Sequence, residues 1–259
     1  MPINFHDQQN TQTYASRNAD ESWISFIKDN VDVANKQISD IGCGGGIYTR
    51  ALVEMGASHV IGVDFSKEML KGAAIHCNNI QNATFLQGEA YQTNLPANKM
   101  DIILERALIH HLDDLNACFK EAFRILKQGG TIIVQDRTPK DCLLPGDENH
   151  IRGYFFEKFP RLMDKEISRR YESGQVESAL ESNGFRITKT GSLWETRCVY
   201  QDVEELKHDL LLRTGRSILH ELTDAELHEL VTFIYEKIKG SPPKIIEKDS
   251  WTIWFAIKE

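Results

Sequence analysis

Several features that mark other protein classes are missing from this chain. No stretch of about 18 apolar residues occurs, so we expect no membrane-spanning helix. The opening residues, Met-Pro-Ile-Asn-Phe-His-Asp, have neither a basic start nor an apolar core, which argues against a secretory signal. No Cys-x-x-Cys pair is present, and the cysteines are scattered, at Cys43, Cys77, Cys118, Cys142 and Cys198. This usage is typical of reduced thiols, so we predict a cytoplasmic protein without a disulfide framework or a metal site.

Positive charge is also in short supply. Lys and Arg number 30 against 38 Asp and Glu, and the formal net charge is −8. Because binding to a phosphate backbone requires a basic surface, we do not expect nucleic acid to be the main partner. The length of 259 residues and the hydrophobic share of 41% suit one large α/β domain. The sequence leaves the oligomeric state open.

The most informative feature that is present is a glycine-rich turn. Residues Asp40 to Gly46 read Asp-Ile-Gly-Cys-Gly-Gly-Gly, directly after a short apolar stretch and directly before a helical pattern. Asp64 ends the next apolar stretch. A glycine turn between a strand and a helix lets a ligand contact the backbone, and an acid at the tip of the second strand can hold two ribose hydroxyls. The pair predicts an adenosine-containing cofactor.

The spacing of the glycines separates two cofactor classes. Nicotinamide and flavin sites favour Gly-x-Gly-x-x-Gly, and the place of the third glycine is occupied here by Ile47. The negative charge of Asp40 would oppose an anionic pyrophosphate at the N-terminus of the following helix. That charge suits a ligand with an ammonium and a sulfonium group, and S-adenosylmethionine carries both.

Five segments within residues 38–136 resemble the ordered motifs of class I S-adenosylmethionine-dependent methyltransferases. They are Asp40–Gly46, Val60–Leu70, Gly88–Ala90, Asp101–Leu112 and Leu126–Val134. The resemblance is strongest to the subgroup that methylates small molecules, such as the quinone-biosynthesis and trans-aconitate types. It implies S-adenosylmethionine as the cofactor and a small molecule as the methyl acceptor. It also implies a Rossmann-like, mostly parallel sheet of seven strands in the order 3-2-1-4-5-7-6, with the seventh strand antiparallel.

The alternation of strand and helix patterns supports an α/β fold independently. We predict strands at residues 37–41, 59–63, 84–87, 101–105 and 131–135, with helices at 47–55 and from Ser66 toward Asn78. Such alternation is typical of a parallel sheet with helices on both faces. The carboxyl ends of its first, second and fourth strands meet around one crevice, where we expect the cofactor.

The second half of the chain has a different pattern. Residues 137–172 are aromatic, charged and interrupted by proline and glycine, so we predict a cap of short helices there. A helix at 174–183, a sixth strand at 185–190, helices at 203–221 and 223–239 and a last strand at 251–258 follow. Thr223-Asp-Ala-Glu226 matches a capping box. We predict a single domain over residues 1–259, in which 137–172 and 201–243 form helical insertions on the substrate side.

The predicted cofactor residues fall into two groups. The turn and the second strand supply Asp40, Gly42, Cys43, Gly44, Gly46 and Asp64. The resemblance adds Phe65, Met69, Glu89, Ala90, Glu105 and Arg17. It places Phe65 and Met69 near the adenine, and it implies that Tyr14 or Arg17 meets the methionine carboxylate. Simpler interpretations also fit, because Asp64 can cap a helix and both Phe65 and Met69 can belong to the core.

His110, His111 and Asp136 are the candidates for catalysis. Imidazole titrates near neutrality, which suits it to proton removal, although the two histidines can equally pack and cap a helix start. A metal site with Asp113 and Asp114 is not expected, because adjacent histidines point in different directions on a helix.

Arg106 is unusual, because the family generally has a small or uncharged residue at this place. Three roles remain open for it: exposure to solvent, pairing with Glu105 and contact with an anionic substrate. Two other functions also remain open. Ile47 and the Gly88-Glu-Ala motif count against a nicotinamide-dependent oxidoreductase. A methyltransferase-like fold that binds the cofactor without catalysis retains the same motifs.

Overall fold

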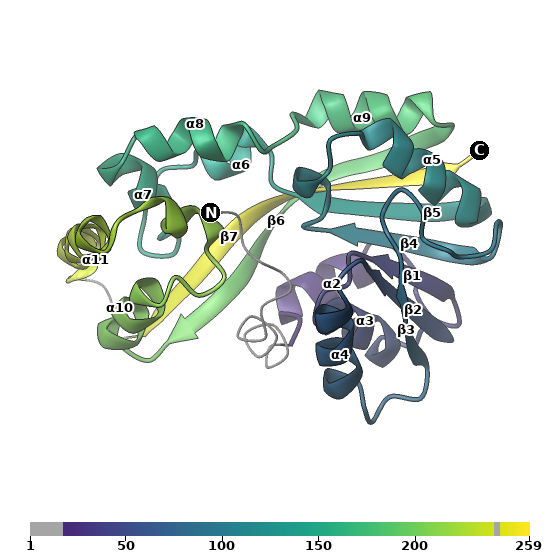
Figure 1. Ribbon diagram of the computed structural model, residues 1–259, viewed down its shortest axis with the longest axis horizontal. Helices are drawn as coiled ribbons and strands as arrows, with labels where there is room; N and C mark the ends of the chain where they lie inside the picture. Colours follow the sequence, from purple (N-terminus) through teal and green to yellow (C-terminus); the bar gives the residue numbers. More distant parts are fainter. Residues whose placement is uncertain (1–17, 241–243) are drawn as a thin grey trace. The chain divides into compact units, whose positions relative to one another are not determined.

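The structure is a computed structural model that describes residues 18–240 and 244–259 (Figure 1). The chain divides into two compact units. The sheet unit comprises residues 18–136, 171–193 and 252–259, and the helical unit comprises residues 137–170, 194–240 and 244–251. That the whole chain forms a single domain with helical insertions stays a prediction.

The sheet has seven strands in the order β3-β2-β1-β4-β5-β7-β6. The strands are β1 Gln37–Ile41, β2 His59–Asp64, β3 Ala83–Gln87, β4 Met100–Arg106, β5 Leu126–Asp136, β6 Phe185–Tyr200 and β7 Ile245–Lys258. The strands from β3 to β5 in this order pair in parallel, whereas β5 and β7 are antiparallel (Figure 1). The predicted fold class and strand order are confirmed.

Helices cover both faces of the sheet because strand side chains alternate between the faces. The described helices of the sheet unit are α2 Glu21–Lys28, α3 Ile47–Glu54, α4 Lys67–His76, α5 Leu115–Ile125 and α9 Ser173–Ser182. Ile103 of β4 packs in a core with α5 and α9. Its neighbours Ile102 and Leu104 pack on the opposite face with α2 and α3. Alternate side chains of β4 therefore pack in two separate cores, one under each helical layer.

The helical unit is held by an apolar core of its own. Its described helices are α6 Pro139–Cys142, α7 Gly153–Lys158, α8 Arg161–Ile167, α10 Val203–Leu211, η2 Ser217–Glu221 and α11 Asp224–Ile238. One apolar face of α11 is buried there, including Leu227, Leu230 and Ile234. The predicted capping box is also confirmed, because Thr223 and Glu226 exchange side-chain and backbone hydrogen bonds.

Three predicted boundaries in the second half of the chain are wrong. The helix predicted at 203–221 ends at Leu211, because Arg213 and Gly215 adopt φ angles of 54° and 61° that a helix cannot continue. Strand β6 runs on from Thr190 to Tyr200. Strand β7 begins at Ile245, six residues before the predicted start, and the added segment carries acidic side chains that are buried rather than solvated.

Those buried acids belong to an ion-pair network within the helical unit. Glu247 accepts hydrogen bonds from Arg197 at 2.9 Å and from Arg216 at 2.7 Å. Asp249 pairs with Arg137 at 2.5 Å. Burial acts to raise the pKa of Glu247, but the charges of Arg216 and Arg197 outweigh it and lower that pKa to about 2. The acids in β7 are therefore charged, and their arginine partners make burial possible.

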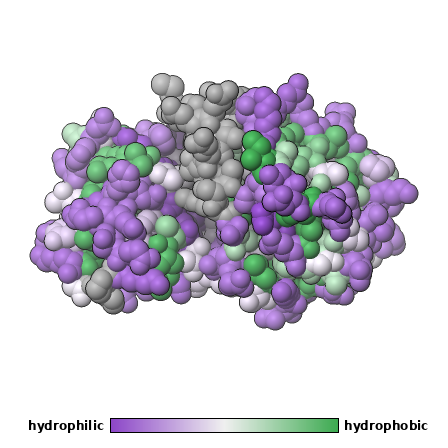
Figure 2. All heavy atoms as spheres, turned by 90° about the horizontal axis from the view of Figure 1, so that it is seen from below, coloured by the Kyte–Doolittle hydropathy of each residue, from purple (hydrophilic) through white to green (hydrophobic). Residues whose placement is uncertain are grey.

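Among the described residues, the surface and the cysteines show no feature that points to a further function. Figure 2 shows one face of the molecule, on which hydrophilic side chains predominate and hydrophobic residues are scattered. All five cysteines are free thiols. Over residues 18–240 and 244–259, no helix is long and apolar enough to cross a membrane. The same ranges contain no group of three His, Cys, Asp or Glu side chains that could hold a metal ion.

Candidate active site

The glycine turn lies at the carboxyl edge of the sheet, between β1 and α3. The amide of Gly42 donates to the carbonyl oxygen of Val63 at 2.8 Å, which ties the turn to β2. The amide of Gly44 donates to Oδ2 of Asp64 at 2.9 Å. Oδ1 of Asp64 accepts a second bond, from the amide of Ser66 at 2.9 Å. The turn and the predicted ribose acid are therefore in direct contact, and it is Ser66 that caps α4.

The turn depends on residues without a side chain. Gly42, Gly44 and Gly46 have φ angles of 74°, 50° and 80°, in the left-handed region that only glycine enters without strain. A Cβ atom on Gly42 would also lie 2.9 Å from Cδ1 of Leu108. The same glycines allow a ligand to approach the backbone closely, which is the property that the sequence motif predicts.

Asp40 is a second acid at the turn and is only 2% exposed. Oγ1 of Thr49 donates to its carboxylate at 2.6 Å. Burial raises the pKa of Asp40 to about 6, the Thr49 bond opposes this, and the charge of Asp64 adds to it. Burial likewise raises the pKa of Asp64. A cation above the turn would stabilise both carboxylates, so the site suits an ammonium or sulfonium group better than a phosphate.

Thr49 was not among the predicted site residues. Its signal in the sequence is a hydroxyl residue in the first turn of the helix that follows the glycines. In the structure this placement brings the hydroxyl back to Asp40, so Thr49 fixes the orientation of the buried carboxylate.

The residues predicted near the adenine lie at the ends of β2 and β3. Phe65 is 49% exposed directly after Asp64, whereas Met69 is buried in the first turn of α4. Glu89 is exposed in a short bridged turn, and Ala90 is partly buried beside it. A phenyl ring beside Asp64 is of the kind that stacks on a base, and the exposed carboxylate of Glu89 can accept from an amine.

The structure does not place the side chains of Cys43 and Arg17 at the turn as cofactor contacts. Cys43 is buried within the turn, and burial followed by the charge of Asp40 raises the pKa of its thiol well above the usual range. It is thus a neutral packing residue whose backbone, not its sulfur, belongs to the ligand-facing turn. Arg17, and Tyr14 with it, lies outside the described residues.

Glu105 points away from the turn, into the core of the sheet unit. It is 1% exposed, and the thiol of Cys118 lies 3.5 Å from each of its carboxylate oxygens. Burial raises the pKa of Glu105 to about 7, and the weak bond from Cys118 opposes this only partly. A cofactor contact by this residue would therefore have to come from its backbone.

Arg106, the next residue, takes the opposite face of β4. Its guanidinium carbon lies 4.0 Å from the centroid of the Tyr48 ring, in a cation–π contact. The Tyr48 ring in turn meets the Trp23 ring edge-on, with centroids 4.7 Å apart. Nε1 of Trp23 donates to Oε1 of Gln135 at 2.8 Å. Because Glu105 and Arg106 leave β4 on opposite faces, the pairing considered for them is not what positions Arg106.

The candidate catalytic residues His110 and Asp136 form a pair. His110 lies in the short helix η1, Ile109–His111, after β4, and Asp136 ends the neighbouring strand β5. Nδ1 of His110 lies 2.8 Å and 3.0 Å from the two carboxylate oxygens of Asp136. Asp136 is 1% exposed. With Nδ1 turned toward the carboxylate, Nε2 is the ring nitrogen that can accept a proton. His111 packs on the ring of His110, with centroids 3.9 Å apart.

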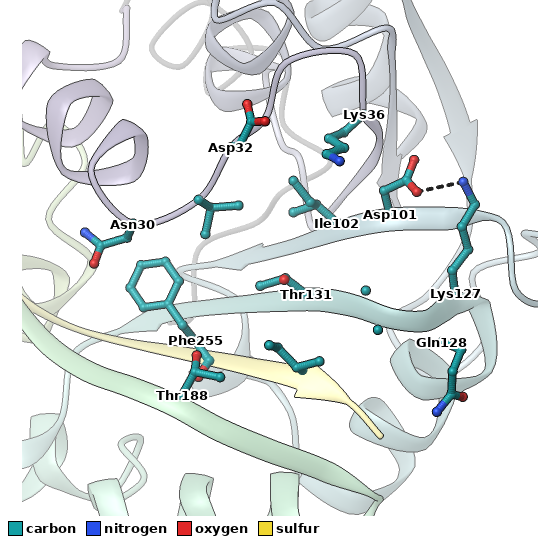
Figure 3. Close-up of a pocket in the computed structure, with 14 residues that line it drawn as sticks. Asn30, Asp32, Lys36, Asp101, Ile102, Lys127, Gln128, Thr131, Thr188 and Phe255 are labelled. Atoms are coloured by element: carbon teal, nitrogen blue, oxygen red, sulfur yellow. Dashed lines mark hydrogen bonds and ion pairs between the residues drawn. The ribbon is translucent and has the colours of Figure 1, made fainter.

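A cavity of about 520 Å³ lies elsewhere in the sheet unit. Figure 3 shows that it is lined by residues at the starting ends of β4 and β5, where Lys127 forms an ion pair with Asp101. Lys36 and Asp32, from the loop before β1, also line it (Figure 3). Ligands of open α/β sheets bind at the carboxyl ends of the strands, so this cavity is not the cofactor site.

Comparison with known proteins agrees with the geometry of the turn. Residues 39–134 match the family model described as a methyltransferase domain. The ubiquinone biosynthesis O-methyltransferase of Pseudomonas fluorescens (strain Pf0-1) is 30% identical over 125 residues, which are 46% of this chain and 53% of that enzyme. The chain thus spans about half the length of the curated relatives it matches.

Two solved structures share the fold at low identity. A proposed methyltransferase from an antibiotic biosynthesis pathway of Anabaena variabilis gives a TM-score of 0.69 at 20% identity, over 93% of this chain and 98% of that one. Phosphoethanolamine N-methyltransferase 2 of Haemonchus contortus, in complex with S-adenosyl-L-methionine, gives 0.60 at 17% identity, over 99% of this chain and 60% of that one. Residues 39–134 therefore resemble a methyltransferase domain in sequence, and the resemblance to class I S-adenosylmethionine-dependent methyltransferases is confirmed over this part of the chain.

Proposed function

We propose that the protein transfers the methyl group of S-adenosylmethionine to a small-molecule acceptor. The observation that carries this proposal is the closed contact between the glycine turn and the ribose acid, in which Gly44 donates to Asp64. The same edge of the sheet holds a second buried acid, Asp40. A cofactor with one ammonium and one sulfonium group complements this pair of acids, and the methyltransferase match over residues 39–134 supports the same chemistry.

The residues at the turn would each bind a different group of the cofactor. Asp64 retains lone pairs beyond those used by the amides of Gly44 and Ser66, and these can accept from ribose hydroxyls. Asp40, held by Thr49, faces the positively charged end of the ligand. When bound, S-adenosylmethionine supplies an electrophilic methyl group on a positively charged sulfur. Orientation of the two reactants then contributes much of the rate, up to about 7–11 kcal/mol in well-ordered systems.

His110 is the general base of the proposed reaction. Nε2 accepts the proton that an acceptor hydroxyl loses, and Asp136 holds the opposite nitrogen and stabilises the imidazolium that forms. The carboxylate is 1% exposed, so water does not compete for it. A dedicated base is needed only if the nucleophile arrives protonated. The pair therefore favours an acceptor that reacts through a hydroxyl group, with phenols and hydroxy acids as the first classes to screen.

The two alternative functions are less well supported. Ile47 and the acid at Asp40 both oppose a pyrophosphate at the start of α3, and the relatives are methyltransferases, so a nicotinamide-dependent oxidoreductase is not favoured. A protein that binds the cofactor without turnover would keep the turn but would have no use for the His110–Asp136 pair. Turnover of an acceptor separates this alternative from the enzyme.

Calorimetric titration with S-adenosylhomocysteine, with NADH as the parallel ligand, is the direct test. We expect binding of S-adenosylhomocysteine alone. The Asp64→Asn variant should bind it at least tenfold more weakly, because the amide cannot accept as two carboxylate oxygens do. Asp32→Asn, at the opposite edge of the sheet, is the matched control and should bind normally. Binding of NADH alone, or equal affinities for Asp64→Asn and the wild type, would contradict the proposal.

A further inference from the structure

Three backbone groups directly after η1 are bonded to tyrosine hydroxyls. The hydroxyl of Tyr171, shortly before α9, donates to the carbonyl oxygen of Leu112 at 2.6 Å. The hydroxyl of Tyr91 accepts from the amide of Asp113 at 3.1 Å and from that of Asp114 at 3.3 Å. Backbone groups of a surface segment otherwise bond to water. The two phenols therefore fix the segment that joins η1 to α5.

Tyr91 belongs to a second segment of the candidate site, residues 88–92 after β3, which we call the β3 turn. Glu89 and Gln92 exchange two backbone hydrogen bonds of 3.0 Å within it. Glu89 is also the acid that is predicted to contact the adenine. The end of the turn is anchored, because the amide and the hydroxyl of Thr93 donate to Oε1 of Glu121 in α5, at 2.8 and 2.6 Å. Tyr91 thus projects from a turn whose backbone is well restrained.

The bonds to Tyr91 span the candidate site. In the sheet, β3 and β4 are separated by β2 and β1, whose carboxyl ends lead to Asp64 and the glycine turn. Tyr91 follows β3, whereas the amides that it accepts from follow β4 and η1. Its hydroxyl therefore connects the two sides of the edge at which the cofactor is proposed to bind. Asp113 comes three residues after His110, so the position of its amide constrains the end of η1 that carries the imidazole.

Capping of α5 does not account for these bonds. Asp114 caps that helix itself, because its Oδ1 accepts from the amide of Ala117 at 3.0 Å. The hydroxyl of Tyr91 accepts from the two amides before the first turn of the helix instead. The ring of Tyr91 is 38% exposed, so apolar burial is not the main effect of this side chain either. The contact that remains is the one between the β3 turn and the segment that carries His110.

We infer that Tyr91 is a positioning residue, whose hydroxyl makes the placement of His110 depend on cofactor binding at the β3 turn. A ligand that contacts the turn restrains it, and the bonds to the amides of Asp113 and Asp114 pass that restraint to η1. The base is then ordered when the methyl donor is present. This inference rests on the proposed function, because it takes His110 as the base and the β3 turn as part of the cofactor site.

The test removes one hydroxyl and observes His110 directly. In the wild type, S-adenosylhomocysteine should shift the ¹⁵N resonances of the His110 imidazole in NMR spectra, which are assigned with His110→Gln. In Tyr91→Phe this shift should be lost, and the amides of Asp113 and Asp114 should exchange with deuterium about tenfold faster, because they lose their acceptor. Affinity for S-adenosylhomocysteine should stay within about threefold. With a working acceptor, kcat should fall about tenfold at an unchanged KM.

Two matched variants make the same change elsewhere. Tyr171→Phe removes the other hydroxyl that is bonded to the segment after η1, but it leaves the bonds to Tyr91 in place. The response of His110 to S-adenosylhomocysteine should therefore persist in this variant. Tyr235→Phe lies in α11 of the helical unit, where the ring contacts Lys207, and it should behave as the wild type in every measurement.

Several outcomes would overturn the inference. An equal response of His110 in Tyr91→Phe and the wild type would mean that the hydroxyl carries no restraint from the turn. A lower melting temperature with an unchanged response would make Tyr91 a structural residue only. If the wild type binds S-adenosylhomocysteine and His110 does not respond, the inference fails and the proposed function stands. If the wild type does not bind S-adenosylhomocysteine, the proposed function fails first and the inference with it.

Discussion

Glu247 in the helical unit and Asp40 and Glu105 in the sheet unit are buried with different kinds of partner. In the helical unit, Glu247 lies between two arginines, and the pKa of its carboxyl is lowered to about 2 although burial opposes this. In the sheet unit, Asp40 and Glu105 have hydroxyl or thiol partners, and burial raises their pKa values to about 6 and about 7. The difference separates an acid whose charge is stabilised by arginine partners from acids for which burial makes the charged form costly.

This contrast explains where function is expected. The charge of an acid with several arginine partners is already compensated without a ligand. Substitution of such an acid should therefore lower the stability of the fold. An acid at the sheet edge, such as Asp40 or Asp64, has a pKa that burial raises, which marks it as a candidate for ligand binding. Substitutions at the sheet edge and in the ion-pair network of the helical unit should therefore separate into effects on activity and effects on stability.

The largest expected effect is on catalysis by the His110–Asp136 pair. In Asp136→Asn, the amide would present an N–H group to Nδ1 of His110 and favour the wrong tautomer of the ring. We expect kcat to fall by about 10²–10⁴ with little change in melting temperature. Steady-state kinetics with an acceptor from the proposed classes measures this. A fall in melting temperature that accounts for the loss of activity would make Asp136 a structural residue like those of the helical unit.

The next effect is on stability. Arg216→Met leaves Glu247 with one arginine fewer and Asp209 without its bond of 2.6 Å. Removal of one partner from a buried ion pair typically costs about 3–5 kcal/mol, so we expect a loss of that size in the free energy of unfolding. Urea denaturation followed by circular dichroism measures it. Affinity for S-adenosylhomocysteine at temperatures well below the melting point should be unchanged, and a loss of affinity alone would break the comparison.

The contributions of Glu105 and Glu247 to the pH dependence of stability should have opposite signs. The folded pKa of Glu105 is raised from 4.5 to about 7, so the folded state holds this proton longer than the unfolded state. Stability from this group is present below pH 4.5 and is lost as the pH rises to about 7, a change of about 3 kcal/mol at most. Glu105→Gln should flatten that decline between pH 5 and 8, as measured by thermal unfolding.

Glu247 provides the opposite half of the same experiment. Its folded pKa is lowered, so its contribution to stability is present above the unfolded value of 4.5 and is lost as the pH falls toward 2. Glu247→Gln should remove part of the acid-induced loss of stability while lowering stability at neutral pH. Parallel pH profiles for the two glutamine variants would contradict the assignment of different roles to the two acids.

The smallest expected effect is at the surface. Arg186 pairs with Glu259, and both side chains are more than half exposed. An exposed pair of this kind contributes below about 1 kcal/mol, so Arg186→Met should shift the free energy of unfolding by no more than that. The measurement is the same urea denaturation as for Arg216→Met. A loss comparable to that of Arg216→Met would mean that burial is not what distinguishes the two arginines.

Much of the fold could be predicted because its signals are local. The glycine turn, the capping residue Ser66 and the alternating strands each lie within a few consecutive residues, and β1 was predicted at its exact bounds. The long strands β6 and β7 were not predicted at full length. The extensions carry charged side chains, a pattern that is typical of solvent-exposed segments. The partners of these side chains lie far away in the sequence: Arg137, for example, precedes Asp249 by 112 residues.

The individual residues of the candidate site could be predicted from the sequence, but most of the contacts between them could not. Asp64 follows the turn at a spacing that the motif itself defines, so its position beside the turn could be foreseen. His110 and Asp136 were separate candidates, and their pairing across 26 residues came from the adjacent exits of β4 and β5. The stack of Arg106 on Tyr48 had no such signal, because it depends on the direction in which one side chain leaves its strand.

The hydrogen bond from the amide of Gly44 to Asp64 can be followed by hydrogen–deuterium exchange. The donor is the backbone amide of Gly44, and a charged carboxylate is a stronger acceptor than a protonated one. Protonation of the carboxylate weakens the acceptor, and a bound ribose holds the carboxylate in place. Hydrogen–deuterium exchange at this one amide should accordingly slow on cofactor binding and quicken in acid, once the intrinsic pH dependence of exchange is removed. A single backbone proton would thus report both the ionisation of Asp64 and binding at the proposed cofactor site.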